Sequence, residues 1–395
     1  MKVSIIGQGY VGLPIAIAAA EVGNQVIGID NNQELVQDLK SGIIRNQDLK
    51  NVNLLDLISK NFYAASMEVS DIKFSDVILV CVPTPLNHEF KPDLSFVLNV
   101  TRAIAPYVTS ETLIIYESTV ATGDIRDKIV PVLLKVTGLT PTDIQVAYSP
   151  ERIDPSNHKW NIKNTPKLIS GINSQSCEKA NQFYSSFISN VVTCSSIEIA
   201  ETAKLLENSY RLINISFINE MSIFCQKLGI DINEVIKAAS TKPYGFMPFF
   251  PSIGVGGHCI PVDPIYLSEK AKEFGLSIQM IELAAKINKE MPQYFMYMAE
   301  KILKNLYGKR VIVVGVAYKP NVADIRETPA KALILGLKSK GAEVFWHDDL
   351  VKEWNNEKSV ALSNLFDLAI LVTPHDYLDL TQLGDVPILN TRGSI

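Results

Sequence analysis

Lys2-Val3-Ser4-Ile5-Ile6-Gly7-Gln8-Gly9-Tyr10-Val11-Gly12 is a strand pattern that runs directly into a GxGxxG and then into a helical stretch, Leu13–Glu21. In this context each glycine has a physical reason: a tight turn, close approach of a pyrophosphate, and close packing of helix on strand. The helix N-terminus adds amide donors and a positive dipole for phosphates. The stretch predicts a dinucleotide-binding loop, and the alternative is a chance glycine turn. The cofactor residues expected in the loop are Gly7, Gly9, Tyr10, Val11 and Gly12.

The next two strand-like runs end in polar residues. Gln25–Ile29 leads into Asp30. In dinucleotide-binding folds an acidic residue at this position accepts hydrogen bonds from the ribose hydroxyls. Asn31 and Asn32 follow and offer no cation for a 2′-phosphate, so NAD is predicted rather than NADP. Val77–Val82 leads into Pro83-Thr84-Pro85, and Thr84 is a candidate to line the cofactor because ligands lie at strand carboxyl ends. The alternative is that the two prolines only shape a turn.

The rest of the first half alternates strands with helical stretches, with further strand-like runs at Thr112–Tyr116 and Gln145–Ala147. This alternation predicts a mostly parallel, doubly wound sheet. Residues 197–228 instead carry apolar side chains at helical spacing, without Pro or Gly until Gly229. We expect one long helix that joins two domains. Because so long a helix buries more than one face, a homodimer is expected to cover it.

The C-terminal part repeats the opening in weakened form. Lys309-Arg310-Val311-Ile312-Val313-Val314-Gly315 resembles residues 1–7, and Gly341–Asp348 resembles Gly23–Asp30. We expect an α/β fold with two Rossmann-like doubly wound domains joined by a long central helix; the alternative is two ordinary strand–helix units with no shared role. The predicted boundaries are 1–195 for the NAD-binding domain, 196–295 for a central helical dimerisation region, and 296–395 for the C-terminal domain.

Composition excludes several classes of protein. At 395 residues the chain is too long for one core, and a net charge of -5 argues against a nucleic-acid partner. Apolar runs long enough to span a membrane and a signal-peptide pattern are both missing, which predicts a cytoplasmic protein without a membrane partner. The five cysteines are scattered, so free thiols in a reducing compartment are expected and a metal site is not.

The stretch that points most clearly to catalysis combines glycines with a histidine, a thiol and an acid: Gly254-Val255-Gly256-Gly257-His258-Cys259-Ile260-Pro261-Val262-Asp263-Pro264. Cysteine is normally a small buried hydrophobe, and this interpretation suits Cys81 and Cys225. Cys259 instead stands among Gly, His, Pro and Asp in a polar turn, which favours a reactive thiol. His258 has two interpretations of equal weight: it lowers the thiol pKa or touches substrate, or it merely caps the turn.

Here the chain resembles the UDP-glucose/GDP-mannose dehydrogenase family over almost its whole length, and most resembles the branch that oxidises UDP-N-acetylglucosamine. The matching motifs are Gly7–Gly12, Val82–Pro85, Glu117-Ser118-Thr119-Val120, Ser149-Pro150-Glu151-Arg152, Lys204 with Asn208, Thr241–Phe246, Gly256–Pro264, Gly315–Lys319 and Asp324–Glu327. The resemblance implies two successive NAD-dependent oxidations at C6 of a UDP-sugar, from alcohol to aldehyde to acid. Such acids usually feed surface polysaccharides.

The resemblance also implies roles for individual residues. Cys259 would form a thiohemiacetal and then a thioester, Lys204 would hold the developing oxyanion, and Asn208 would orient it. Asp263 and Thr119 would position a water, and Glu151 would act as acid/base in hydrolysis. Thr119 and Arg326 would also contact the cofactor, and the C-terminal domain would hold UDP. The substrate-binding residues implied are Glu151, Arg152, Lys204, Asn208, Phe250, Gly256, His258 and Lys319.

Each of these residues also has an ordinary structural interpretation. Lys204 and Glu201 would form a solvated helix face, Thr119 would cap a helix over Thr122–Val132, and Glu151 would pair with Arg152.

Branch-specific residues favour the N-acetylglucosamine type. Ile260-Pro261 and Tyr318-Lys319-Pro320-Asn321 resemble that type, whereas the N-acetylmannosamine type tends to have Ala after the residue that follows the cysteine. Two departures stand against a simple assignment: Ser252 where the family often has Gly, and Ala323 where Asp is common. UDP-N-acetylmannosamine and UDP-glucose are the alternative substrates.

Two other classes of protein remain open. A non-catalytic sugar-nucleotide-binding paralogue would lose the thiol, Lys204 or Glu151, and all three are present. A simple two-electron dehydrogenase would share the N-terminal fold and the long helix, but needs neither the cysteine nor a second nucleotide domain. One NADH per substrate would indicate that class, and two would indicate the four-electron enzyme.

Overall fold

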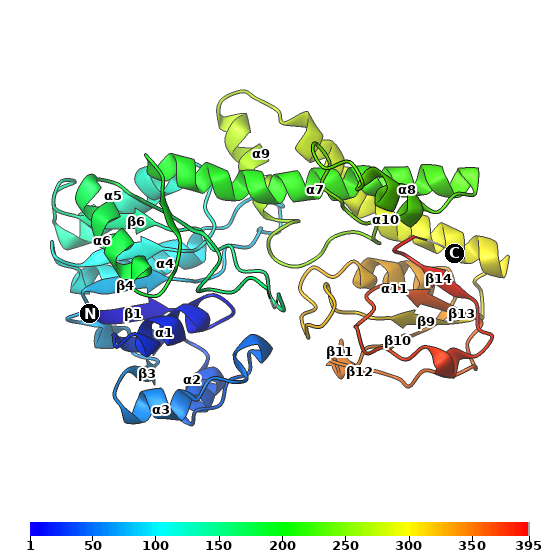
Figure 1. Ribbon diagram of the computed structural model, residues 1–395, viewed down its shortest axis with the longest axis horizontal. Coiled ribbons are helices and arrows are strands. Elements are labelled where there is room, and N and C mark those ends of the chain that lie inside the picture. The colour runs from blue at the N-terminus through cyan, green and yellow to red at the C-terminus, as the bar shows by residue number, and fades with distance from the viewer. Residues whose placement is uncertain (158, 394–395) are drawn as a thin grey trace. The chain divides into compact units, whose positions relative to one another are not determined.

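The computed structural model describes residues 1–157 and 159–393, and the chain divides into two compact units, residues 1–206 and 207–395. The helix α7 (Ile197–Leu228) runs from the first unit into the second (Figure 1). It is the long joining helix that the sequence predicts. The domain boundaries predicted at 195 and 295 stay a prediction. No helix in the described residues is long and apolar enough to cross a membrane.

The first unit is built on one eight-stranded sheet with the order β3-β2-β1-β4-β5-β6-β7-β8. Neighbouring strands are parallel except for the antiparallel pair β6 and β7. The strands are β1 (Lys2–Ile6), β2 (Gln25–Ile29), β3 (Tyr63–Ser66), β4 (Val77–Val80), β5 (Leu113–Tyr116), β6 (Gln145–Tyr148), β7 (Lys167–Gly171) and β8 (Val191–Thr193). The prediction of a mostly parallel, doubly wound sheet is confirmed.

Helices of the first unit pack on this sheet: α1 lies against β1, β2 and β3, and α6 lies against β5 to β8. Because both faces are covered, strands such as β4 and β5 are apolar and buried at every position rather than alternating. The helices are α1 (Gly12–Glu21), α2 (Gln33–Lys40), α3 (Leu54–Ser59), α4 (Ser95–Ile104), α5 (Val130–Thr137) and α6 (Ser174–Ser185). Where a helix was expected over Thr122–Val132, residues Ile125–Ile129 form a π-helical turn, and the α-helix α5 begins only at Val130.

The second unit contains a four-stranded parallel sheet with the order β10-β9-β13-β14. Its strands are β9 (Arg310–Val314), β10 (Glu343–His347), β13 (Leu368–Leu371) and β14 (Ile388–Asn390), and a small hairpin pairs β11 (Glu353–Trp354) with β12 (Glu357–Lys358). The remaining helices are α8 (Ile232–Ala239), α9 (Asp263–Glu273), α10 (Gln279–Leu303) and α11 (Ala330–Ser339). The helix α10 packs on α11. Apolar side chains of both helices form one buried core with those of β9 and β13.

The predicted internal repeat is present in the strand order. The neighbours β2-β1-β4 of the first sheet correspond to β10-β9-β13 of the second, with the same parallel pairing. Both units therefore have an α/β sheet of the Rossmann type, and the fold class predicted from the sequence is confirmed.

Candidate functional site

The glycine loop connects β1 to α1 in the first unit. Gly7 has a positive φ of +93°, and a Cβ there would lie 2.6 Å from the carbonyl oxygen of Cys81. A Cβ on Gly12 would lie 1.8 Å from the carbonyl oxygen of Gly7, so the turn and the start of α1 need both glycines. At Gly9 a Cβ would meet nothing within 4 Å. The bare backbone at Gly9 faces open space, which is the room that a pyrophosphate needs to approach the loop.

Asp30 closes this region at the end of β2. Its carboxylate accepts hydrogen bonds from the amides of Gln8, at 2.8 Å, and Asn32, at 2.9 Å, while the side chain stays half-buried. The carboxylate is thus fixed on the glycine loop with lone pairs left for ribose hydroxyls. Tyr10, in the loop, is exposed, and Val11 stands directly before α1. The loop and Asp30 together fit a dinucleotide.

Two further loops follow β4 and β5. Thr84 is buried at 2% exposure, and Thr119 is half-buried. The Ser118 hydroxyl donates to the carbonyl of Val82 at 2.7 Å, which links the two loops at the carboxyl edge of the sheet. These positions are where ligands of an open parallel sheet lie, at the reversal of strand order.

Glu151 and Arg152 lie in the loop after β6. The Glu151 Oε1 atom accepts a hydrogen bond from the amide of Ile153, and its Oε2 atom lies 4.0 Å from Nζ of Lys167. Arg152 donates to the carbonyl of Pro166 at 2.7 Å. Lys167, from the neighbouring strand β7, is therefore an ion-pair partner of Glu151.

The first turns of α7 carry Glu201 and Lys204, and neither is solvated. Lys204 is 6% exposed, and its Nζ donates to the carbonyl of Glu151 at 2.5 Å. Glu201 is fully buried and accepts from the amides of Gly123, at 2.5 Å, and Ile125, at 3.1 Å. Burial raises the pKa of Glu201 to about 8, although these two amides act in the opposite direction. The interpretation of this face as an ordinary solvated one is wrong.

Cys259 lies in a turn of the second unit directly before α9. Its carbonyl accepts the amides of Val262, at 3.1 Å, and Asp263, at 2.8 Å, and its side chain is exposed. Asp263 begins α9, is 1% exposed, and accepts a hydrogen bond from Nδ2 of Asn208 at 2.6 Å. The turn thus joins an exposed thiol to a buried amide–carboxylate pair.

Backbone packing fixes the loop before Cys259. Gly257 has a φ of +81° and donates its amide to the carbonyl of Arg326 at 2.9 Å. A Cβ on Gly256 would lie 2.6 Å from the carbonyl oxygen of Glu327, and one on Gly257 would lie 2.8 Å from the ring of Tyr318. The loop therefore rests directly on the segment 318–327, which carries two predicted ligand-binding residues.

Those two residues are Lys319 and Arg326. Lys319 is half-buried, and the guanidinium of Arg326 holds both carboxylate oxygens of Asp324 at 2.6–3.0 Å. His258 is half-buried. Phe250, which precedes the glycine-rich loop in the sequence, is 58% exposed.

The predicted site residues fall into two groups, one in each unit. The first unit holds Gly7, Gly9, Tyr10, Val11, Gly12, Asp30, Thr84, Thr119, Glu151, Arg152 and Lys204, and the second holds Asn208, Phe250, Gly256, His258, Cys259, Asp263, Lys319 and Arg326. Within α7, Lys204 and Asn208 are one helical turn apart.

The other four cysteines differ from Cys259 in their surroundings. Burial raises the pKa of the Cys81 thiol well above its usual range and also raises the pKa of Cys177 and Cys194. Cys225 is 2% exposed in an apolar cluster. Among the five, only Cys259 is exposed, as a thiol that meets a substrate must be.

Residues that the sequence did not single out form a buried polar cluster behind Glu151: Glu117, Lys167 and Tyr184. In the sequence, Glu117 stands out only as part of the motif Glu117-Ser118-Thr119-Val120, and the signal for Lys167 is a lysine beside the apolar residues Leu168 and Ile169.

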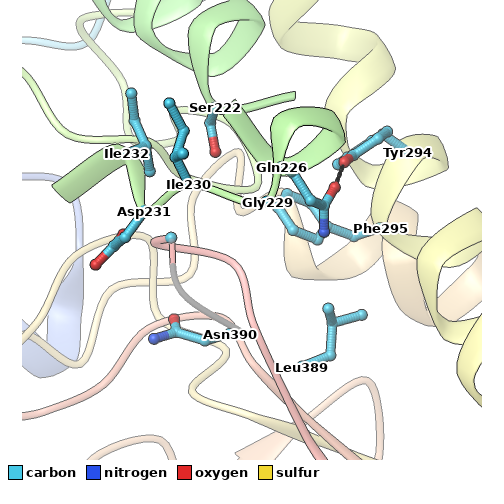
Figure 2. Close-up of a pocket in the computed structure, with 11 residues that line it drawn as sticks. Ser222, Gln226, Gly229, Ile230, Asp231, Ile232, Tyr294, Phe295, Leu389 and Asn390 are labelled. Carbon is cyan, nitrogen blue, oxygen red and sulfur yellow. Dashed lines mark hydrogen bonds between the residues drawn. The ribbon is translucent and has the colours of Figure 1, made fainter. Parts of the chain in front are cut away.

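A pocket of about 310 Å³ lies elsewhere, in the second unit (Figure 2). Its lining comes from the end of α7, from the turn that precedes α8, and from α10 and β14. Among the lining residues, the hydroxyl of Tyr294 donates a hydrogen bond to Gln226. The lining residues include none of those predicted for the site.

The glycine loop, Asp30 and the strand reversal beside them place this chain among the dinucleotide-binding oxidoreductases. Three domain models of one family match it: the NAD binding domain over residues 1–188, the central domain over 198–290 and the UDP binding domain over 312–389. The chain belongs to the UDP-glucose/GDP-mannose dehydrogenase family. It is an NAD-dependent nucleotide-sugar dehydrogenase, which confirms the resemblance and the cofactor predicted from the sequence.

The relatives whose names state an activity are dehydrogenases of different UDP-sugars. The chain is 35% identical to protein CapL of Staphylococcus aureus, over 96% of this chain and 91% of that protein. It is 35% identical to the UDP-N-acetyl-D-glucosamine 6-dehydrogenase of Salmonella typhi, over 83% and 77% of the two chains. Its fold matches the structure of the UDP-D-ManNAc dehydrogenase of Pyrococcus horikoshii with a TM-score of 0.91 and 29% identity, over 99% and 95%.

Proposed function

We propose that the chain oxidises C6 of UDP-N-acetylglucosamine to the uronic acid in two steps, with Cys259 as the covalent nucleophile. The observation that carries the proposal is the exposed Cys259 thiol, held in a turn that is braced by the buried Asn208–Asp263 pair. Bound NAD would accept a hydride from the substrate in each oxidation.

The thiol allows one enzyme to complete both oxidations. After the first, the Cys259 sulfur adds to the aldehyde carbon, and the aldehyde oxygen becomes the oxyanion of a thiohemiacetal. Loss of the C6 hydrogen as hydride restores the carbonyl as a thioester. Water then attacks that carbonyl, the C–S bond breaks, and the acid leaves with the thiol regenerated.

The remaining residues of the proposed machinery support charge and water. The buried ammonium of Lys204 would stabilise the oxyanion, because a charge removed from water acts more strongly than a solvated one. Asn208 would orient the same oxygen while holding Asp263. Asp263 and Thr119 would position the water, and Glu151 would accept its proton during hydrolysis.

Cofactor and substrate would be held by further residues of the two units. Gly7, Gly9 and Gly12 would admit the pyrophosphate, and Asp30 would take the ribose hydroxyls. Arg152, Phe250, His258 and Lys319 are proposed to bind the sugar nucleotide. Arg326 is proposed to contact the cofactor, with its guanidinium oriented by Asp324.

The N-acetylglucosamine substrate is proposed from the motifs Ile260-Pro261 and Tyr318–Asn321, and the relative from Salmonella typhi supports it. UDP-N-acetylmannosamine is the second candidate, which the structural match to the Pyrococcus horikoshii protein favours. Initial rates with a panel of UDP-sugars would separate them. We expect UDP-N-acetylglucosamine to be oxidised fastest, with two NADH per sugar; a preference for the mannosamine epimer would reverse the choice, and one NADH per sugar would refute the four-electron reaction.

We also propose a homodimer that covers α7. Tyr210, Phe217 and Phe224 are each about half exposed and recur every seven residues, so they form one apolar stripe on this helix. A closed two-fold dimer is the commonest way to bury such a stripe. Sedimentation at micromolar concentration is expected to show a dimer, and Phe217→Glu is expected to give a monomer. A fully active monomer of the unaltered chain would contradict the proposal.

A further inference from the structure

Lys167 is a lysine in the interior of the first unit that none of the proposed steps uses. It begins β7 and is 3% exposed. Its Nζ donates to the carboxylate of Glu117 and, at 3.2 Å, to the carbonyl of Pro150. The other carboxylate oxygen of Glu117 accepts a hydrogen bond from Tyr184. The ammonium thus has two fixed partners, one from each of two different loops.

These two loops carry two residues of the proposed machinery. Glu117 follows β5 and stands two residues before Thr119, while Pro150 follows β6 and stands directly before Glu151. Because β5 and β6 are neighbouring parallel strands, both loops emerge at the same edge of the sheet. One buried ammonium therefore ties the Thr119 loop to the Glu151 loop.

The same ammonium also faces the carboxylate of Glu151. Oε1 of Glu151 is held by the amide of Ile153, and the backbone carbonyl is held by Lys204. Oε2 is buried and accepts no hydrogen bond from the described part of the chain, and Lys167 Nζ lies 4.0 Å from it. At that separation two opposite charges attract appreciably, more strongly in a buried site than in water.

A buried ion pair contributes little net free energy to the stability of a fold. Desolvation costs several kcal/mol per ion, and apolar side chains of similar volume often serve stability equally well. A pair such as Lys167–Glu117 is better explained by a requirement for fixed geometry than by stability. Burial raises the pKa of Glu117 to about 7, with Lys167 lowering it and Glu151 raising it further.

We propose that Lys167 is a positioning residue that holds Glu151 in place for hydrolysis of the thioester. The inference rests on the proposed function, because it assumes that Glu151 serves that step. Lys167 fixes the loop through Pro150 and aims Oε2 through its charge, so its loss affects the hydrolytic water more than the two earlier oxidations. The cofactor loop at Gly7–Gly12 lies outside these contacts.

The test uses the double variant Lys167→Met/Glu117→Gln. Both charges are removed together, because Lys167→Met alone would leave the Glu117 carboxylate buried without its partner. The variant is mixed with NAD and UDP-N-acetylglucosamine, or with UDP-N-acetylmannosamine if the unaltered chain prefers it. We expect a burst of two NADH per site, then a steady rate reduced roughly 10- to 100-fold, as for a misplaced catalytic group. Intact-protein mass spectrometry is expected to show an acyl adduct at Cys259, which a defect in NAD binding alone would not produce.

Two comparisons make the result specific. Tyr184→Phe removes a hydrogen bond of Glu117 but leaves Lys167 with both Glu117 and Pro150, and it is expected to show neither the burst nor the adduct. Glu151→Gln is expected to accumulate the same adduct. Normal hydrolysis in the folded double variant, beside an adduct in Glu151→Gln, would overturn this inference alone. No adduct in Glu151→Gln, despite normal binding, would overturn the proposed role of Glu151 and the inference with it.

Discussion

The two Rossmann-type sheets of this protein share local details as well as strand order. In the first, Asp76 accepts the amide of Lys2 at 2.8 Å, and in the second, Asp367 accepts the amide of Arg310 at 2.8 Å. Gly7 and Gly315 both have positive φ, and both donate their amides to the carbonyl that ends the neighbouring strand. The scaffold is therefore the same in both repeats.

The loop after the first strand differs between the repeats. The first has Gly7-Gln8-Gly9-Tyr10-Val11-Gly12, whereas the second has Gly315-Val316-Ala317-Tyr318-Lys319-Pro320. A helix starts at Gly12 in the first repeat, while in the second the next helix starts only at Ala330. The second loop thus lacks the bare backbone at its third position and the helix N-terminus that bind a pyrophosphate.

The acid after the second strand differs as well. Asp30 is half-buried and accepts two amides, so part of its carboxylate remains for a ligand. Asp348 is 1% exposed and accepts the amides of Val316, Ala317, Leu350 and Val351 and a hydrogen bond with Nε2 of His375. The same residue type at the same place keeps part of its carboxylate open in the first repeat and has it occupied by donors of the fold in the second.

Among the changes that compare the two repeats, the largest effect is expected from Gly12→Ala in the first. The new methyl group would lie 1.8 Å from the Gly7 carbonyl oxygen, so the loop must shift. Overpacking of this kind costs about 1–3 kcal/mol, and we expect NAD affinity to fall up to roughly 100-fold in isothermal titration. Pro320→Ala, the matched change in the second repeat, is expected to leave NAD affinity alone. Equal effects of both changes would mean that the repeats do not differ in cofactor binding.

The two acids are expected to give opposite results. Asp30→Asn would weaken NAD binding by roughly 1–2 kcal/mol, the scale of a hydrogen bond to a charged group, with little change in melting temperature. Asp348→Asn would leave NAD affinity unchanged and lower the free energy of unfolding by about 1–3 kcal/mol, because buried donors lose their acceptor. Titration and thermal unfolding of both variants would check this, and a loss of NAD affinity in Asp348→Asn would be the contrary result.

Acid is expected to weaken the second repeat through Asp348. Burial alone would raise the pKa of Asp348, but the bonds from His375 and the Val351 and Val316 amides outweigh it and hold the pKa at about 2. A carboxyl whose pKa is lower in the folded state stabilises the fold above its unfolded pKa, near 4. On the order of 2 kcal/mol is therefore lost as pH falls from about 4 to 2. Urea unfolding across this range would measure it, and Asp348→Asn is expected to flatten the dependence.

Much of this arrangement was predictable from the sequence because it depends on local patterns. The strand pattern before Gly7, the acid at Asp30 and the uninterrupted helical spacing of residues 197–228 each depend on neighbouring residues alone. The strand β7 was missed because it starts with Lys167 and ends with Ser170 and Gly171, which are unusual in a buried strand.

Contacts across the sheet were beyond the reach of sequence patterns. The burial of Asp348 by His375 and the cluster of Glu117, Lys167 and Tyr184 join residues that are 27 to 67 positions apart. In the sequence alone, the charged residues among them cannot be told from ordinary surface residues. Only the strand order brings them together. The same holds for Glu201, whose partners in the loop after β5 convert an apparently solvated face into a buried one.

The smallest effect is expected from Arg326→Ala in the segment that supports the Cys259 loop. The guanidinium is half exposed and is oriented by Asp324. We expect the KM for UDP-sugar or for NAD to rise roughly tenfold, the worth of one charge-assisted hydrogen bond. Unchanged kinetics for both ligands would show that Arg326 is only a surface charge.

The central claim is that the Cys259 thiol carries the sugar through the second oxidation. Serine changes little in volume, so Cys259→Ser is expected to fold and to bind NAD and UDP-N-acetylglucosamine normally. The hydroxyl lacks an accessible anionic form near neutral pH, so it is a far poorer acyl carrier. Production of the uronic acid, followed by chromatography of the UDP-sugars, is expected to fall by several orders of magnitude, equivalent to roughly 4 kcal/mol or more of barrier. Near-normal formation of the acid by Cys259→Ser would contradict the covalent mechanism.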